Sequence, residues 1–93
     1  MELNQLRKRI DLLDQQIIAL IGERMRVVRQ IGEYKRKNEM QIFDSLREQA
    51  VFKKIATLGK NVGLSTEFVI NLFKAIMEEA KKIQLNGVRL LDN

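Results

Sequence analysis

The first third of the chain repeats apolar residues at alternating spacings of three and four. Arg24 occupies the single position of this series at which a charged residue replaces the expected apolar one. The repeat predicts one amphipathic helix over residues 3–37 that packs along its whole length against other helices. It is carried by Leu3, Leu6, Ile10, Leu13, Ile17, Leu20, Val27, Ile31 and Tyr34.

A helix of this length is too long for its own chain to cover. At 1.5 Å per residue it spans about 50 Å, whereas a compact domain of this size has a radius of gyration of about 12 Å. The pattern therefore predicts an obligate helical oligomer, with a second copy of the chain as the simplest cover. An arginine within the buried stripe needs an anionic partner, because an isolated buried charge is too costly.

Two shorter helices are predicted after a loop at 37–41 and an apolar anchor at Ile42 and Phe43. The second helix begins near Asp44 or Ser45, where Ser45 and Glu48 fit a capping box. Gly59 and Gly63 are predicted to take left-handed conformations at its end. Its predicted buried face comprises Leu46, Ala50, Val51, Ile55 and Leu58.

The third helix begins after Ser65 as N-cap and is predicted to stop at Asn86 and Gly87, with a frayed tail over 87–93. Its apolar face ends with the polar Gln84. That face comprises Val69, Leu72, Phe73, Ile76, Ala80 and Ile83. The sequence thus predicts one all-α domain over residues 1–93, with one long and two shorter helices.

Composition excludes several kinds of chemistry. The 93 residues include no histidine and no cysteine, so catalysis by thiol or imidazole and zinc or disulfide sites are excluded. We expect a cytoplasmic protein, since the chain shows neither a signal sequence nor an apolar run of about 18 residues.

The net charge of +5 favours an anionic partner, either nucleic acid or a small polyanionic metabolite. Acidic residues are interspersed with the basic ones along the first helix, and aromatic residues are scarce. Both features weaken the hypothesis that the chain is a nucleic-acid-binding module. A purely structural coiled-coil dimer would leave Arg24 and Gln84 unexplained.

The polar residues on this frame have a recognisable order. It runs from Arg7 in Leu-Arg-Lys-Arg-Ile-Asp, through Arg24, Lys35, Asp44, Arg47 and Glu48, to Gln84. In this order and spacing the chain, from about position 3 to 84, resembles the all-helical chorismate mutases of the AroQ class. The resemblance implies an intertwined homodimer that converts chorismate to prephenate without metal or cofactor, and no role for nucleic acid or membrane.

The resemblance also implies a role for each residue. Arg7 would reach into the partner's site and Arg24 would hold a carboxylate in its own. Lys35 and Gln84 would donate hydrogen bonds to the ether oxygen of the breaking bond. Asp44 and Glu48 would handle the ring hydroxyl while Arg47 lines the pocket. Ala80 stands where the family often has a hydroxyl-bearing residue, so one substrate contact is expected to be absent.

Taken singly, each residue also has an ordinary structural interpretation. Arg24 could pair across the oligomer, Arg7 and Lys35 could be solvated, and Glu48 could be only a capping residue. Within the same fold, the isochorismate-pyruvate lyases share the arginines and the loop lysine. Glu48 beside Arg47 favours the mutase.

Overall fold

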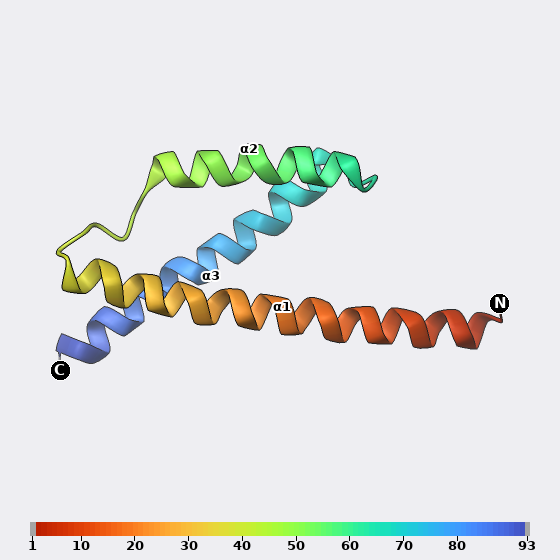
Figure 1. Ribbon diagram of the computed structural model, residues 1–93, viewed down its shortest axis with the longest axis horizontal. Coiled ribbons are helices and arrows are strands. Elements are labelled where there is room, and N and C mark those ends of the chain that lie inside the picture. The colour runs from red at the N-terminus through yellow and green to blue at the C-terminus, as the bar shows by residue number, and fades with distance from the viewer. Residues whose placement is uncertain (1, 93) are drawn as a thin grey trace.

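The computed structural model describes residues 2–92, with side chains through residue 87. These described residues form three α-helices, α1 (Leu3–Lys37), α2 (Ser45–Asn61) and α3 (Thr66–Asp92) (Figure 1). The predicted all-α class, with one long and two shorter helices, is confirmed. Within this part of the chain, none of the helices has an apolar stretch long enough to cross a membrane.

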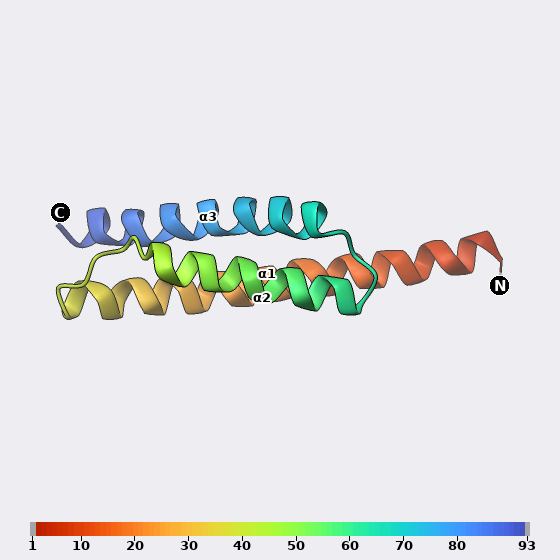
Figure 2. The same ribbon diagram turned by 90° about the horizontal axis from the view of Figure 1, so that it is seen from above.

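The shape is elongated because α1 extends beyond the other two helices. Figure 2 shows its red N-terminal part projecting past the ends of α2 and α3. The longest dimension is 55 Å and the radius of gyration is 16.7 Å, compared with about 12 Å for a compact chain of this length. As predicted from its length, α1 is covered by its own chain over only part of its course.

Helix α3 packs against both of the other helices, whereas no Cα pair between α1 and α2 in the described residues lies within 8 Å. The core between α1 and α3 consists of Met25, Val28, Ile76 and Ala80, with Ile21, Phe73 and Ile83 beside it. Helices α1 and α2 therefore pack on α3 without contacting each other closely, and side chains line the space between them.

The stripe of α1 that packs on α3 is not the predicted one. Val27, Ile31 and Tyr34 are exposed, while Met25 and Val28 are buried. The predicted stripe and the observed one run side by side on the same helix. Apolar spacing indicated that α1 is covered, but it did not indicate which neighbour covers which side.

Two glycines permit close helix contacts. A Cβ atom built on Gly32 would lie 3.1 Å from Cγ of Gln84, and one built on Gly59 would lie 2.9 Å from Cγ1 of Val69. The prediction that Gly59 is left-handed is wrong, because it lies inside α2 against α3. Gly63, with φ of 79°, has the predicted left-handed conformation.

The N-terminal ends of α2 and α3 were predicted more accurately than their C-terminal ends and their buried faces. Asp44 caps α2 by accepting a hydrogen bond from the Arg47 amide at 3.0 Å, so the predicted Ser45–Glu48 capping box is wrong. Ser65 caps α3 as predicted, accepting from the Phe68 amide at 3.1 Å.

On α2, Leu46, Ala50 and Leu58 of the predicted buried face are exposed, because α3 is the only helix that packs against α2 within the described part of the chain. The predicted stop of α3 at Asn86 and Gly87 is wrong, since the helix continues to Asp92. A glycine inside a helix costs only about 1 kcal/mol relative to alanine and need not end it. The last position of the predicted tail, 93, lies outside the described residues.

Candidate active site

A cavity of about 160 Å³ lies where the three helices and the loop before α2 converge. Basic, acidic and amide groups share its wall with apolar side chains. The lining residues are Arg24, Val28, Ile31, Lys35, Ile42, Asp44, Arg47, Glu48, Val51, Met77, Ala80, Lys81 and Gln84.

The cavity brings together seven of the eight residues that the sequence singled out. Helix α1 contributes Arg24 and Lys35, and α3 contributes Ala80 and Gln84; the other three are Asp44, Arg47 and Glu48 at the start of α2. Arg7 is not among them. It is exposed and lies about 25 Å from Arg24 along α1, at 1.5 Å per residue.

Arg24 is a partly buried cation in the cavity wall. Its Nη1 atom is buried and has no hydrogen-bond partner among the described residues. The guanidinium carbon lies 5.8 Å from the centre of the Phe73 ring. Burial, and then the nearby charge of Arg47, lower the pKa of Arg24, but a guanidinium in a protein remains protonated. The site therefore holds a partly desolvated positive charge with an unused donor.

Gln84 provides a second unsatisfied polar group. Its Oε1 atom is buried without a hydrogen-bond partner in the described structure. The close contact of its Cγ with Gly32 holds the side chain against α1. Rotation of the terminal amide can present either its oxygen or its NH₂ group to the cavity. Buried polar groups without partners are rare, and a bound ligand is one explanation for them.

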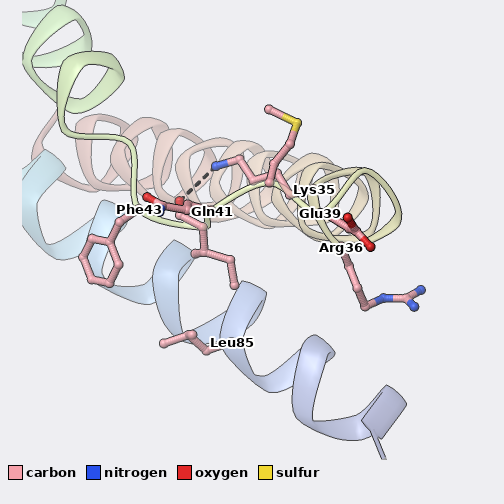
Figure 3. A pocket seen from close by; sticks show the side chains of 8 residues that line it. Lys35, Arg36, Glu39, Gln41, Phe43 and Leu85 are labelled. Carbon is pink, nitrogen blue, oxygen red and sulfur yellow. Dashed lines mark hydrogen bonds between the residues drawn. The ribbon is translucent and has the colours of Figure 1, made fainter.

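Lys35 ties the loop to α1. Its Nζ donates a hydrogen bond to the carbonyl oxygen of Ile42 at 2.9 Å, drawn as a dashed line in Figure 3. An ammonium group has three donors, so two remain for other partners. A second cavity, of about 470 Å³, shares Lys35 and Ile42 with the first and extends to Met40, Phe43 and Leu85.

The start of α2 presents a carboxylate that is already paired. Glu48 Oε1 lies 2.9 Å from Nζ of Lys81, which comes from α3. Lys81 also lies 4.6 Å from the centre of the Phe43 ring. The hydrogen bond to Glu48 is the main cause of the raised pKa of Lys81; the charges of Glu48 and Glu78 also raise it, while partial burial acts in the opposite direction.

The charges in the cavity wall do not balance. Four cations, from Arg24, Lys35, Arg47 and Lys81, face the two carboxylates of Asp44 and Glu48. The formal excess of two positive charges suits a doubly negative ligand. Within the described residues, no cluster of three or more acidic side chains could hold a metal ion.

Lys81 and most of the apolar side chains in the cavity wall were not predicted from the sequence as site residues. Lys81 lies three residues before Gln84, the spacing that places two side chains on one face of a helix. That spacing could have identified it, but a lysine on a helix is usually solvated. Two other wall residues, Ile31 and Val51, were predicted only to pack against other helices. Two more, Val28 and Met77, were not identified.

Over the described residues, the fold and the cavity define a three-helix architecture with a cation-rich site between the helices. Residues 6–85 match the family model described as chorismate mutase type II. The "Chorismate mutase" of Methanocaldococcus jannaschii is 30% identical over 83 residues, which cover 89% of this chain and 84% of that protein. The chain belongs to the chorismate mutase type II family, and the predicted resemblance is confirmed.

Longer relatives match over one part of their length. The "Bifunctional chorismate mutase/prephenate dehydratase" of Buchnera aphidicola subsp. Schizaphis graminum is 35% identical over 79 residues, or 85% of this chain and 20% of that protein. The protein of the same name from Aquifex aeolicus is 33% identical over 86 residues, or 89% of this chain and 24% of that protein. The chain thus spans about a fifth to a quarter of these two relatives.

Proposed function

We propose that this chain is a chorismate mutase, which rearranges chorismate to prephenate in the cavity between its three helices. The observation that carries the proposal is the pair of unsatisfied buried groups, Arg24 Nη1 and Gln84 Oε1, in a cavity wall that also contains Lys35. Family membership supports the choice of reaction.

The reaction suits a site without histidine or cysteine. The ether C–O bond of chorismate breaks as a C–C bond forms within the same molecule, so no proton, electron or group leaves the substrate. The enzyme must select a folded conformer and stabilise the charge that develops on the ether oxygen. A cavity with an excess of positive charge and fixed donors can do both.

Six polar residues of the cavity have definite roles in this proposal. Arg24 binds a carboxylate of the substrate through its unused donor. Lys35 and the amide of Gln84 donate to the ether oxygen, as an oxyanion hole does. The start of α2 binds the ring hydroxyl, with Glu48 accepting its hydrogen bond and Asp44 contributing beside it. Arg47 adds positive charge to the wall.

The second carboxylate requires Arg7 from another copy of the chain. The apolar stripe beside Arg7 supports a homodimer, since Leu3 is 60% exposed, Ile17 54% and Leu20 69%. In addition, no side chain among the described residues is less than 2% exposed. A second α1 that covers this stripe would complete a thin core and bring the partner's copy of Arg7 to the cavity.

The cavity of the single chain is smaller than a typical small-molecule site. About 160 Å³ is less than the roughly 300 Å³ at the lower end of small-molecule pockets. A compact metabolite and a wall completed by a partner chain would account for this difference.

The direct test is incubation of the purified chain with chorismate and, separately, with isochorismate. We expect chorismate to disappear as prephenate forms, with little pyruvate released from isochorismate. Pyruvate release without prephenate formation would instead identify an isochorismate-pyruvate lyase. The mass of the same sample in solution, measured by light scattering, should be twice the 10.9 kDa of one chain.

A further inference from the structure

One ion pair in the cavity wall joins parts of the chain that are distant in sequence. Lys81 of α3 and Glu48 of α2 are 2.9 Å apart, and their side chains are 24% and 29% exposed. The pair Arg26–Glu23 makes a useful contrast, because it lies within one turn of α1 and its side chains are 68% and 58% exposed. Exposed local pairs contribute little, whereas the Lys81 pair links two helices at the candidate site.

Three elements meet at the Lys81 ammonium. Besides Glu48, it contacts the ring of Phe43 in the loop before α2, with 4.6 Å to the ring centre. Glu78, one turn earlier on α3, lies 3.8 Å away and is mostly exposed. The contacts with Glu48 and Phe43 are both to residues outside α3, so Lys81 is held over the start of α2. It also restricts the positions that the Glu48 carboxylate can take.

We propose that Lys81 is a positioning residue, which orients the Glu48 carboxylate toward the substrate's ring hydroxyl and offsets its charge beside a doubly negative substrate. This inference rests on the proposed function, in which Glu48 binds that hydroxyl.

The physical basis of this proposal is that Glu48 has two opposing effects on the substrate. A carboxylate is a good acceptor for a hydroxyl, but its negative charge repels the carboxylates of a dianion in the same cavity. A neighbouring ammonium removes most of this repulsion and leaves the second carboxylate oxygen available as an acceptor. Without Lys81, Glu48 would gain rotameric freedom and its charge would be unpaired.

The test is a double-mutant cycle on Lys81 and Glu48. The variants are Lys81→Met, Glu48→Gln and the combination of the two, assayed with chorismate. Lys82→Met is the matched control, since Lys82 is the next residue on α3 and is exposed. Lys81→Gln repeats the neutral change with a polar side chain, and Lys81→Arg preserves the charge. Circular dichroism of each variant confirms that the helices are retained.

We expect Lys81→Met to raise KM about tenfold while kcat changes by less than about twofold, because the hydroxyl contact exists in both the ground state and the transition state. Lys81→Arg should restore most of this loss, and Lys82→Met should match the wild type. In the Glu48→Gln background, Lys81→Met should change KM less than about twofold, since contacting residues are coupled.

Two results would overturn the inference. One is wild-type kinetics for both Lys81→Met and Lys81→Gln. The other is a double variant whose loss equals the product of the two single losses, which would mean that Lys81 acts independently of Glu48. Failure of the wild-type chain to convert chorismate would contradict the proposed function itself and is therefore distinguishable.

Discussion

The two halves of α1 have similar apolar patterns but different surroundings. Residues 3–20 are all exposed, although they include six members of the apolar repeat. In residues 21–37, Met25, Val28 and Gly32 are buried against α3. Arg24 and Lys35 from the same half line the cavity. The C-terminal half of α1 packs against α3 and contributes residues to the candidate site. The apolar stripe of the N-terminal half is exposed in the single chain.

This difference shows what an amphipathic pattern specifies. Apolar spacing fixes which side of a helix avoids water, but it does not determine whether the cover comes from the same chain. On our proposal, the N-terminal half of α1 is covered by a second chain and delivers Arg7 to that chain's cavity. The two halves would then serve different sites, and changes in each half should have different effects.

The largest effect is expected in the C-terminal half. Arg24→Ala should lower kcat/KM at least about a hundredfold, since loss of a fixed donor to developing or bound charge costs about 3 to 4 kcal/mol. Lys35→Ala should have a similar effect. Arg26→Ala is the control, because Arg26 lies one half-turn away and pairs only locally with Glu23. Steady-state kinetics and circular dichroism provide the measurements. A fully active Arg24→Ala protein would show that this arginine has a structural role and does not bind the substrate.

In the N-terminal half, Ile17→Glu should dissociate the proposed dimer. A carboxylate placed in an apolar interface weakens association by about 2 kcal/mol or more, and activity should fall with it. Gln15→Glu introduces the same charge on the opposite side of α1 and should leave the mass unchanged. Analytical ultracentrifugation gives the mass of each variant. An Ile17→Glu protein with wild-type mass and turnover would show that the exposed stripe is not an interface.

The glycines of α1 allow a comparison in one helix. Gly32→Ala should lower kcat about tenfold, because the new methyl group would lie 3.1 Å from Gln84 Cγ and displace the amide that our proposal assigns as a donor to the ether oxygen. Gly22 has no atom within 4 Å of its Cβ position. Gly22→Ala should therefore keep full activity and stabilise the protein by about 0.5 to 1 kcal/mol. Steady-state kinetics and urea unfolding measure the two effects. Equal kinetics for both variants would show that Gly32 is not needed to position Gln84.

The smallest effect concerns stability at high pH. The pKa of Lys81 is raised above its ordinary value of 10.5, so its pairing with Glu48 and Glu78 stabilises the folded state while the ammonium is protonated. This contribution is fully present below pH 10.5 and is lost as the pH rises through the folded-state pKa. The difference in Tm between wild type and Lys81→Met should be constant near neutrality and shrink above that pH. A difference that grows with pH would contradict the assignment.

Much of the fold followed from the sequence because its signals are local. The starts of α2 and α3 depend on Asp44 and Ser65, whose side chains cap the adjacent amides. The length of α1 follows from an apolar repeat that extends from Leu3 to Tyr34 with one charged position, Arg24. The end of α3 was wrong because Gly87 can remain helical when the flanking residues favour a helix.

The candidate site was predictable to the extent that its residues carry charge at recognisable spacings. Arg24 and Gln84 interrupt apolar faces, which makes them visible in a sequence. Lys81 does not, because a lysine at an outer position of a helix resembles any solvated lysine. Only the arrangement of α2 over α3 reveals that it meets Glu48.

The most direct test of a site shared between chains is complementation between two inactive variants. Arg7→Ala and Arg24→Ala chains are unfolded, mixed in equal amounts and refolded together, and prephenate formation is measured. A mixed dimer would contain one site with both arginines, so random pairing predicts about a quarter of wild-type activity. A mixture that stays as inactive as its two components would contradict the shared site.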